Sequence, residues 1–197
     1  MKRLLLTGFE KFLSFSSNPS EEIAFELNQK KVGSYHCSSV ILPVDFENSS
    51  KVLLETLDKG DFDAILSLGL AFSREYISLE RVAINLIDDT LRKDNSGRYI
   101  EDQKIIENAE NAYFSTLPLK RLQKILREEN FKTEISLSAG SYVCNLVMFQ
   151  LLHFLNLKNK VCPAGFIHLP PDKKLKAESG WSLDRLKKCI EVIIENL

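Results

Sequence analysis

The sequence lacks an excess of charge of either sign. Lysine and arginine number 26 and aspartate and glutamate number 27, so the formal net charge is −1. A nearly neutral chain exerts no general electrostatic attraction on nucleic acid or on anionic lipid. We therefore expect neither nucleic acid nor a membrane among its partners.

Long hydrophobic runs are also missing. The longest apolar stretch, residues 143–157, is interrupted by Asn145, Gln150 and His153, whereas a membrane-spanning helix needs a longer and purer run. The apolar residues at the start of the chain give way to Gly8 too soon for the core of a secretory signal peptide. These two absences predict a cytoplasmic protein.

Cysteine is scarce, and no two cysteines stand close enough for a CxxC pair. The chain has four, widely spaced along its 197 residues: Cys37, Cys144, Cys162 and Cys189. In a chain of this length without an export signal, this pattern favours free thiols over a disulfide framework.

Repeats and low-complexity linkers are absent as well, and apolar strand-like runs alternate with amphipathic segments. Strands are predicted near residues 3–6, 38–42, 64–68, 76–86, 131–137 and 161–169, and helices near 18–27, 52–57, 119–126, 141–157 and 183–194. Asn18 is a good N-cap for the first helix, and Pro19 suits its first position. The polar segment 88–97 is predicted to be a loop. The alternation predicts a single α/β domain over residues 1–197, with a mixed or mostly parallel twisted sheet and helices on both faces.

The segment 138–145 joins a predicted strand to a predicted helix through small residues, and it carries Cys144. Cys144 should lie in the first turn of that helix, where backbone N–H groups and the helix dipole favour a thiolate and lower the thiol pKa. The same N–H groups could hold an oxyanion. The alternative is a structural thiol, because cysteine is among the most often buried residues.

A histidine and a carboxylate stand in two other apolar segments. His168 closes a strand-like run before Pro170, at the sheet edge where α/β proteins place their sites, and imidazole is suited to deprotonate a thiol. Glu80 lies within another such run and could orient an imidazole. The alternatives are a hydrogen-bonded core histidine and an ion pair of Glu80 with Arg81 or another cation. The residues alone indicate a cysteine hydrolase and name no substrate.

Together these segments resemble the pyroglutamyl peptidase I family of cysteine peptidases, also called pyrrolidone-carboxylate peptidases. Similar motifs follow in the same order along nearly the whole chain: Thr7-Gly8-Phe9-Glu10, Asn18-Pro19-Ser20, Leu42-Pro43-Val44, Gly69 to Arg74, Glu80 to Asn85, Ala112 to Pro118, Ser138 to Asn145 and Gly165 to His168. Several co-linear motifs are far more specific than any one of them. The resemblance implies removal of an N-terminal pyroglutamate (5-oxoproline) residue from peptides.

The resemblance also implies the roles of particular residues. The catalytic triad of the family maps onto Glu80, Cys144 and His168: the thiolate attacks, the imidazole transfers the proton and the carboxylate orients the imidazole. No metal and no organic cofactor is implied, and the protein is expected to form a homo-oligomer, a tetramer or a dimer.

Pyroglutamate is a neutral lactam, so its pocket needs apolar walls and only a few polar groups. The family walls this pocket with aromatic residues from the first loop, and Phe15 is a further candidate there. Ordinary core packing is the alternative for these aromatic residues. The implied substrate-binding residues are Phe9, Phe12, Leu70, Arg92 and Ser141.

Three loops depart from the usual sequence of the family, and so does the proline-rich run after His168, which continues as Leu169-Pro170-Pro171-Asp172-Lys173. Lys11 to Ser14 replaces Pro-Phe-Gly-Gly, and Leu70 to Arg74 replaces Gln-Ala-Gly-Gly-Arg. The glycines lost at Leu13, Ser14, Phe72 and Ser73 remove freedom at positive φ and add side-chain bulk. The loop 88–95, which carries Arg92, is one residue longer than in the family. We expect a pocket of altered shape around an unchanged triad.

Two other functions are consistent with the sequence. A thiol amidase for another small acyl group would use the same scaffold, and the altered loop after Gly69 would permit it. A binding protein that keeps the triad without using it would have a cysteine with an ordinary pKa of about 8.5. A panel of N-terminal acyl groups separates the first from a pyroglutamyl peptidase, and thiol alkylation separates the second.

Overall fold

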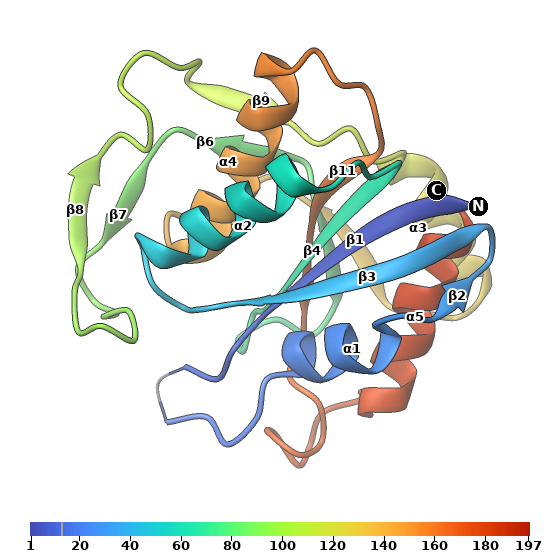
Figure 1. The fold of residues 1–197 in the computed structure, drawn as a ribbon. Helices are drawn as coiled ribbons and strands as arrows, with labels where there is room; N and C mark the ends of the chain where they lie inside the picture. The colour runs from blue at the N-terminus through green and yellow to red at the C-terminus, as the bar shows by residue number, and fades with distance from the viewer. Residues whose placement is uncertain (13) are drawn as a thin grey trace.

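A central sheet organises the protein. The computed structural model describes residues 1–12 and 14–197, so Leu13 lies outside the described residues. Within them, seven strands pair in the order β10-β5-β11-β4-β1-β3-β2 (Figure 1). Their bounds are β1 Lys2–Phe9, β2 Lys31–Val32, β3 Tyr35–Leu42, β4 Ala64–Leu70, β5 Ile77–Glu80, β10 Thr133–Ser136 and β11 Ala164–Leu169. Only the β5–β11 and β2–β3 pairs of this described sheet are antiparallel, so it is mixed and mostly parallel, as predicted.

Helices cover both faces of this sheet. Those described are α1 Pro19–Leu27, α2 Asn48–Lys59, α3 Leu119–Glu128, α4 Val143–Leu157 and α5 Leu183–Glu195. One hydrophobic core joins α1, α3 and α5 to one face, and a second core joins α2 and α4 to the other (Figure 1). The fold class predicted from the sequence is confirmed.

Strand β1 supplies both cores, because successive side chains of a strand point to opposite faces. Leu4 is buried on the side of α1 and α5, while Leu5 and Phe9 are buried on the side of α2 and α4. Gly8 has no room for a side chain, since a Cβ there would lie 2.2 Å from the carbonyl oxygen of Ser20. The start of α1 therefore lies directly against the end of β1.

The start of α1 follows the predicted capping pattern. Asn18 Oδ1 accepts a hydrogen bond from the backbone N–H of Ser20 at 3.1 Å, and Pro19 opens the helix. The Nδ2 group of Asn18 donates to the carbonyl oxygen of Glu10 at 3.0 Å. Because Asn18 is buried, these bonds tie the residue that follows β1 firmly to the helix start.

Among the described residues, short strands outside the main sheet form two antiparallel pairs, β6–β9 and β7–β8. Their bounds are β6 Val82–Ile84, β7 Ile87–Asp89, β8 Ile100–Gln103 and β9 Ala112–Phe114. The predicted strand 76–86 contains β5 and β6. The predicted loop 88–97 is wrong for its first two residues, because Asp88 and Asp89 belong to β7. Within the described ranges, no helix reaches the length and apolarity of a bilayer-crossing segment.

Candidate active site at the carboxyl edge of the sheet

Two parallel strands end side by side at the edge of the sheet where the site lies. β4 and β11 pair so that Gly69 is opposite His168 and Leu70 is opposite Leu169. His168 faces the α4 side of the sheet, because Phe166, two residues earlier on the same strand, belongs to the core on that side. The carboxyl ends of parallel strands are the usual place for sites in α/β proteins.

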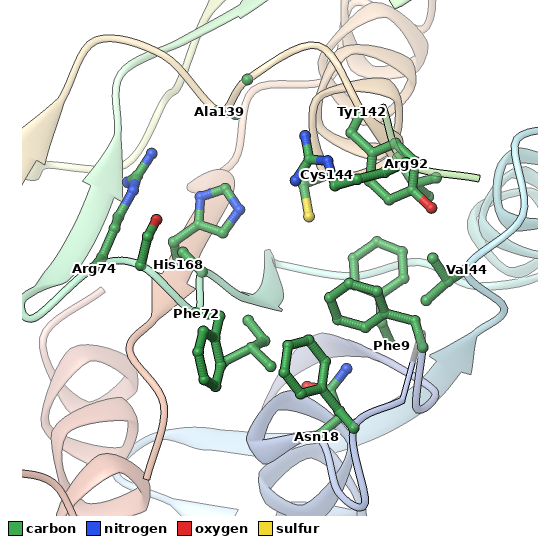
Figure 2. Close-up of a pocket in the computed structure, with 17 residues that line it drawn as sticks. Phe9, Asn18, Val44, Phe72, Arg74, Arg92, Ala139, Tyr142, Cys144 and His168 are labelled. Carbon is green, nitrogen blue, oxygen red and sulfur yellow. The ribbon is translucent and has the colours of Figure 1, made fainter. Parts of the chain in front are cut away.

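Cys144 reaches this edge from α4, of which it is the second residue. A Cβ built on Gly69 would lie 3.1 Å from Cys144 Sγ and 2.7 Å from Phe166 Cζ. The missing side chain of Gly69 therefore provides the space for the sulfur. Because Gly69 and His168 are register partners on one face, the sulfur lies beside the imidazole (Figure 2).

Glu80 stands on the other side of the imidazole. It is the last residue of β5, the strand next to β11, and it is fully buried. Its Oε1 accepts hydrogen bonds from His168 Nδ1 at 2.7 Å and from Arg74 Nη1 at 2.6 Å. Arg74 also donates from Nη2 to the carbonyl oxygen of Ser138 at 3.0 Å. The second oxygen, Oε2, is buried without a hydrogen-bond partner among residues 1–12 and 14–197.

These contacts determine which nitrogen of His168 carries the proton. A carboxylate oxygen that accepts from Arg74 can only accept from the imidazole, so Nδ1 is the N–H and Nε2 keeps its lone pair. Figure 2 shows the ring between Arg74 and the sulfur of Cys144, so Nε2 faces the sulfur. The ion pair considered as an alternative role for Glu80 is also present, with Arg74 rather than Arg81 as the cation.

Burial controls the ionisation of Cys144. Loss of hydration raises the pKa of this thiol to about 12, although the charge of Arg92 acts in the opposite direction. Tyr142, the N-cap residue of α4, places no side-chain acceptor on the N–H groups of the first turn, so these groups remain available there. The prediction that the helix start lowers the thiol pKa is nevertheless wrong, because the desolvation of the sulfur is the larger effect.

Burial acts on His168 in the same sense, toward the neutral form. It lowers the pKa of the imidazole, although the hydrogen bond to Glu80 and its charge act to raise it. The resting pair is therefore a thiol and an uncharged imidazole. Such a pair can transfer a proton once charge develops on a bound reactant.

A pocket of about 340 Å³ opens in front of Cys144 and His168 (Figure 2). Its walls are mostly apolar, and among them are Phe9, Phe12, Val44, Leu70, Tyr142 and Val143. This size and lining suit a small, largely apolar group.

The structure brings most of the predicted binding residues to this pocket. Phe9, Phe12, Leu70 and Arg92 line it. Ser141 is absent from the described lining residues. Its hydroxyl donates to the carbonyl oxygen of Asp88 at 2.6 Å, and its own carbonyl accepts from the N–H of Asp88 at 3.0 Å. Ser141 thus ties the start of α4 to β7.

Arg92 is placed by two neighbours that the sequence did not single out. Its guanidinium carbon lies 4.8 Å from the centre of the Tyr142 ring, and its Nε donates to Asp89 Oδ2 at 2.7 Å. The hydroxyl of Tyr142 donates to the carbonyl oxygen of Lys93 at 2.9 Å. The only sequence signal for Tyr142 is that it precedes Val143 and Cys144, and the only signal for Arg74 is its place in the motif that begins at Gly69.

The remaining cysteines lie away from the pocket. Cys37, Cys162 and Cys189 are buried free thiols, and burial raises the pKa of each. His153 is a partly buried residue whose Nδ1 lies 2.9 Å from the hydroxyl oxygen of Tyr113. In the part of the chain that the structure describes, no three His, Cys, Asp or Glu residues cluster in a way that could hold a metal ion.

Comparisons with known proteins identify the family and the fold of the chain. The chain matches the family described as pyroglutamyl peptidase over residues 2–195. It is 43% identical to the pyrrolidone-carboxylate peptidase of Halalkalibacterium halodurans over 98% of both chains, and 40% identical to that of Pyrococcus furiosus over 99% of both. The solved structure of pyrrolidone carboxyl peptidase from Thermococcus litoralis has a TM-score of 0.95 and 35% identity, over 99% of this chain and 92% of that one. The chain belongs to the pyroglutamyl peptidase family.

Proposed function

We propose that this protein is a cysteine exopeptidase that removes an N-terminal pyroglutamate residue from peptides. Cys144 is the nucleophile, His168 is the general base and acid, and Glu80 orients the imidazole. The observation that carries the proposal is the row of these three side chains at the edge of an apolar pocket. Membership of the family supports the reaction class, since relatives over the full length are pyrrolidone-carboxylate peptidases.

The lining of the pocket fits a lactam better than an ordinary N-terminal residue. A free N-terminus carries an ammonium group, and a pocket that binds one needs an acidic partner. Among the described residues that line this pocket, none is acidic. Phe9, Phe12 and Val44 instead offer apolar surface to the uncharged ring of pyroglutamate.

Acylation begins when Cys144 Sγ attacks the carbonyl carbon of the pyroglutamyl residue. His168 Nε2 takes the proton from Sγ while the S–C bond forms, which avoids an isolated thiolate in a site that disfavours one. The C–N bond then breaks, and the imidazolium gives the proton to the leaving amine. Glu80 keeps Nδ1–H in place through both transfers.

Water completes the reaction by attacking the thioester carbonyl. His168 accepts a proton from this water and returns it to Sγ as the S–C bond breaks, so free pyroglutamate leaves and the thiol is restored. In both steps the carbonyl oxygen becomes an oxyanion. We assign the uncapped N–H groups at the start of α4 to this charge, together with the guanidinium of Arg92, whose positive charge acts on the Cys144 thiol.

We further propose that residues 1–197 act as one catalytic domain and that the protein works in the cytoplasm as a homo-oligomer, a dimer or a tetramer. Resemblance to the family supports these statements. Size-exclusion chromatography with light scattering measures the oligomeric state directly, and a monomeric mass would contradict that part of the proposal.

The proposed reaction is tested with a fluorogenic pyroglutamyl amide, with the matching prolyl and N-acetyl-alanyl amides as controls. Wild type should cleave only the pyroglutamyl compound. Cys144→Ser should be inactive, whereas Cys162→Ser, which changes a buried thiol outside the pocket, should keep wild-type activity. Cleavage of the acetyl-alanyl amide instead would indicate a thiol amidase, and a folded but inert wild type would indicate a binding protein.

A further inference from the structure

The turn after β4 carries an aromatic side chain at the mouth of the pocket. Ala71 donates its N–H to the carbonyl oxygen of Leu169 at 2.8 Å, and Arg74 donates its N–H to the carbonyl oxygen of Ala71 at 3.0 Å. Phe72 therefore sits on a tight turn just beyond the paired ends of β4 and β11. Its side chain is 39% exposed, so core packing does not account for it.

Phe72 is held in position by other aromatic residues of the pocket. Its ring stacks on that of Phe15 with centroids 4.8 Å apart and an angle of 26° between the planes. Phe15 in turn meets Phe12 edge-on, with centroids 5.3 Å apart. We call Phe12, Phe15 and Phe72 the aromatic rim, and all three line the pocket.

The chemistry of the reaction fixes which side of Cys144 the leaving peptide occupies. The leaving nitrogen must lie within reach of His168 Nε2, because the imidazolium protonates it. In Figure 2, Phe72 and Arg74 lie on the His168 side of the sulfur, whereas Phe9 and Val44 lie on the opposite side. The pyroglutamyl ring therefore occupies the side of Phe9, and the next residue of the peptide occupies the side of Phe72.

The positive charge of Arg74, on the side of the site that holds the leaving peptide, is already neutralised. The guanidinium of Arg74 is bound to Glu80 and to the carbonyl oxygen of Ser138, so it offers little attraction to an acidic side chain. Phe72 is left as the surface that a substrate side chain meets there. An aromatic face of this kind favours aromatic or large apolar groups.

We propose that Phe72, supported by Phe15, is the specificity-determining residue for the side chain that follows pyroglutamate, and that it selects aromatic and large apolar residues over small ones. The inference rests on the proposed function. It concerns the side of the same site that holds the leaving peptide, where the turn from Leu70 to Arg74 carries Phe72.

The test compares pyroglutamyl-phenylalanine amide with pyroglutamyl-alanine amide, which differ only in the side chain that meets Phe72. Wild type should show a kcat/KM about 3- to 10-fold higher for the phenylalanine compound, the range expected for one additional aromatic contact. Phe72→Ala should abolish this preference, so that the ratio of the two kcat/KM values falls to about one. Phe72→Leu should keep part of it. Phe25→Ala removes a 76% exposed aromatic ring on α1 and serves as the matched control.

Each outcome has a distinct meaning. Equal kcat/KM for the two amides in wild type overturns the inference while the proposed function stands. An equal loss on both substrates in Phe72→Ala and Phe72→Leu also overturns it, because the ring would then support the site as a whole. A folded wild type that cleaves neither amide, nor the fluorogenic substrate, overturns the proposed function and this inference with it.

Discussion

The oxygen that Glu80 shares between Arg74 and His168 leads to a prediction about Glu80→Gln. The amide that replaces the carboxylate has one acceptor, its oxygen, and one donor, its nitrogen. If the oxygen takes the place of Oε1, it still accepts from both Arg74 Nη1 and His168 Nδ1. The reverse orientation would turn an N–H₂ group toward two donors. Arg74 should therefore hold the amide so that His168 keeps its correct tautomer.

The expected magnitude follows from what the single substitution removes. Hydrogen bonds to a charged acceptor contribute about 1.5–3 kcal/mol and those to a neutral one about 0.5–1.5 kcal/mol. The negative charge of Glu80 also raises the pKa of the Cys144 thiol, so its removal offsets part of the loss. A net loss of about 2 kcal/mol lowers kcat/KM roughly 30-fold. Glu80→Gln should remain far from the roughly 10⁴-fold loss that accompanies a reversed tautomer.

Removal of Arg74 should release the amide. In Glu80→Gln/Arg74→Met the side chain can turn its N–H₂ group toward His168 Nδ1, which places the imidazole proton on Nε2, facing Cys144. The double variant should then lose about 10⁴-fold in kcat/KM, well beyond the product of the two single losses. Arg74→Met alone keeps the carboxylate and therefore the tautomer.

The assay is kcat/KM for the fluorogenic pyroglutamyl amide in a double-mutant cycle. Circular dichroism and urea unfolding confirm that each variant is folded. The shared-oxygen argument fails if Glu80→Gln alone loses about 10⁴-fold, or if the two single losses simply multiply in the double variant.

Three further predictions concern the packing and ionisation around the site. Gly69→Ala puts a Cβ 3.1 Å from Cys144 Sγ and should displace the sulfur. We expect kcat/KM to fall by about 10²-fold, while overpacking lowers the free energy of unfolding by only about 1–3 kcal/mol. Near-normal activity would refute the close approach of Gly69 and Cys144. Asn145→Ala removes a fully buried amide that accepts from the N–H of Ile84 at 3.0 Å and donates to the carbonyl oxygen of Ile84 at 2.9 Å. Urea unfolding should show that the free energy of unfolding falls by about 3 kcal/mol, and a decrease of less than about 1 kcal/mol would contradict this role. Activity requires uncharged His168, and burial lowers the pKa of its imidazole. Therefore kcat/KM should fall only as the pH drops below the ordinary histidine pKa of about 6.5. A midpoint of the pH profile above that value would contradict the assignment.

The helices and main strands were predictable because their signals are local. Asn18 and Pro19 predict the start of α1, because they form its N-cap and its first position, and apolar runs predict β1 and β4. The strands β7, β8 and β9 were missed, since each has only three or four residues, which is too short for an alternating pattern to be recognised. They pair through backbone groups, which every sequence provides.

From the residues alone the site was predictable only residue by residue, and it was the resemblance to the family that joined the three residues into a triad. Cys144, His168 and Glu80 each stand in a segment that suits their chemistry, but what brings them together is the strand order β5-β11-β4. No local pattern encodes that order. Arg74 was overlooked for the same reason, because its contact with Glu80 depends on how the turn after β4 folds back beside β5.

The pKa of Cys144 shows that the position of a residue along a helix does not by itself predict its ionisation. The position at the start of α4 is as predicted, and such a position favours a thiolate in an exposed helix. Here Cys144 lies between the end of the sheet and α4, where the loss of hydration raises its pKa to about 12. A thiol with such a pKa is alkylated slowly even when it is the nucleophile of an active enzyme. Slow alkylation of Cys144 in the free protein therefore does not show that this cysteine has no catalytic role. Release of the amine from the fluorogenic substrate, absent in Cys144→Ser, is the sound criterion, because the thiol loses its proton to His168 only as the acyl-enzyme forms.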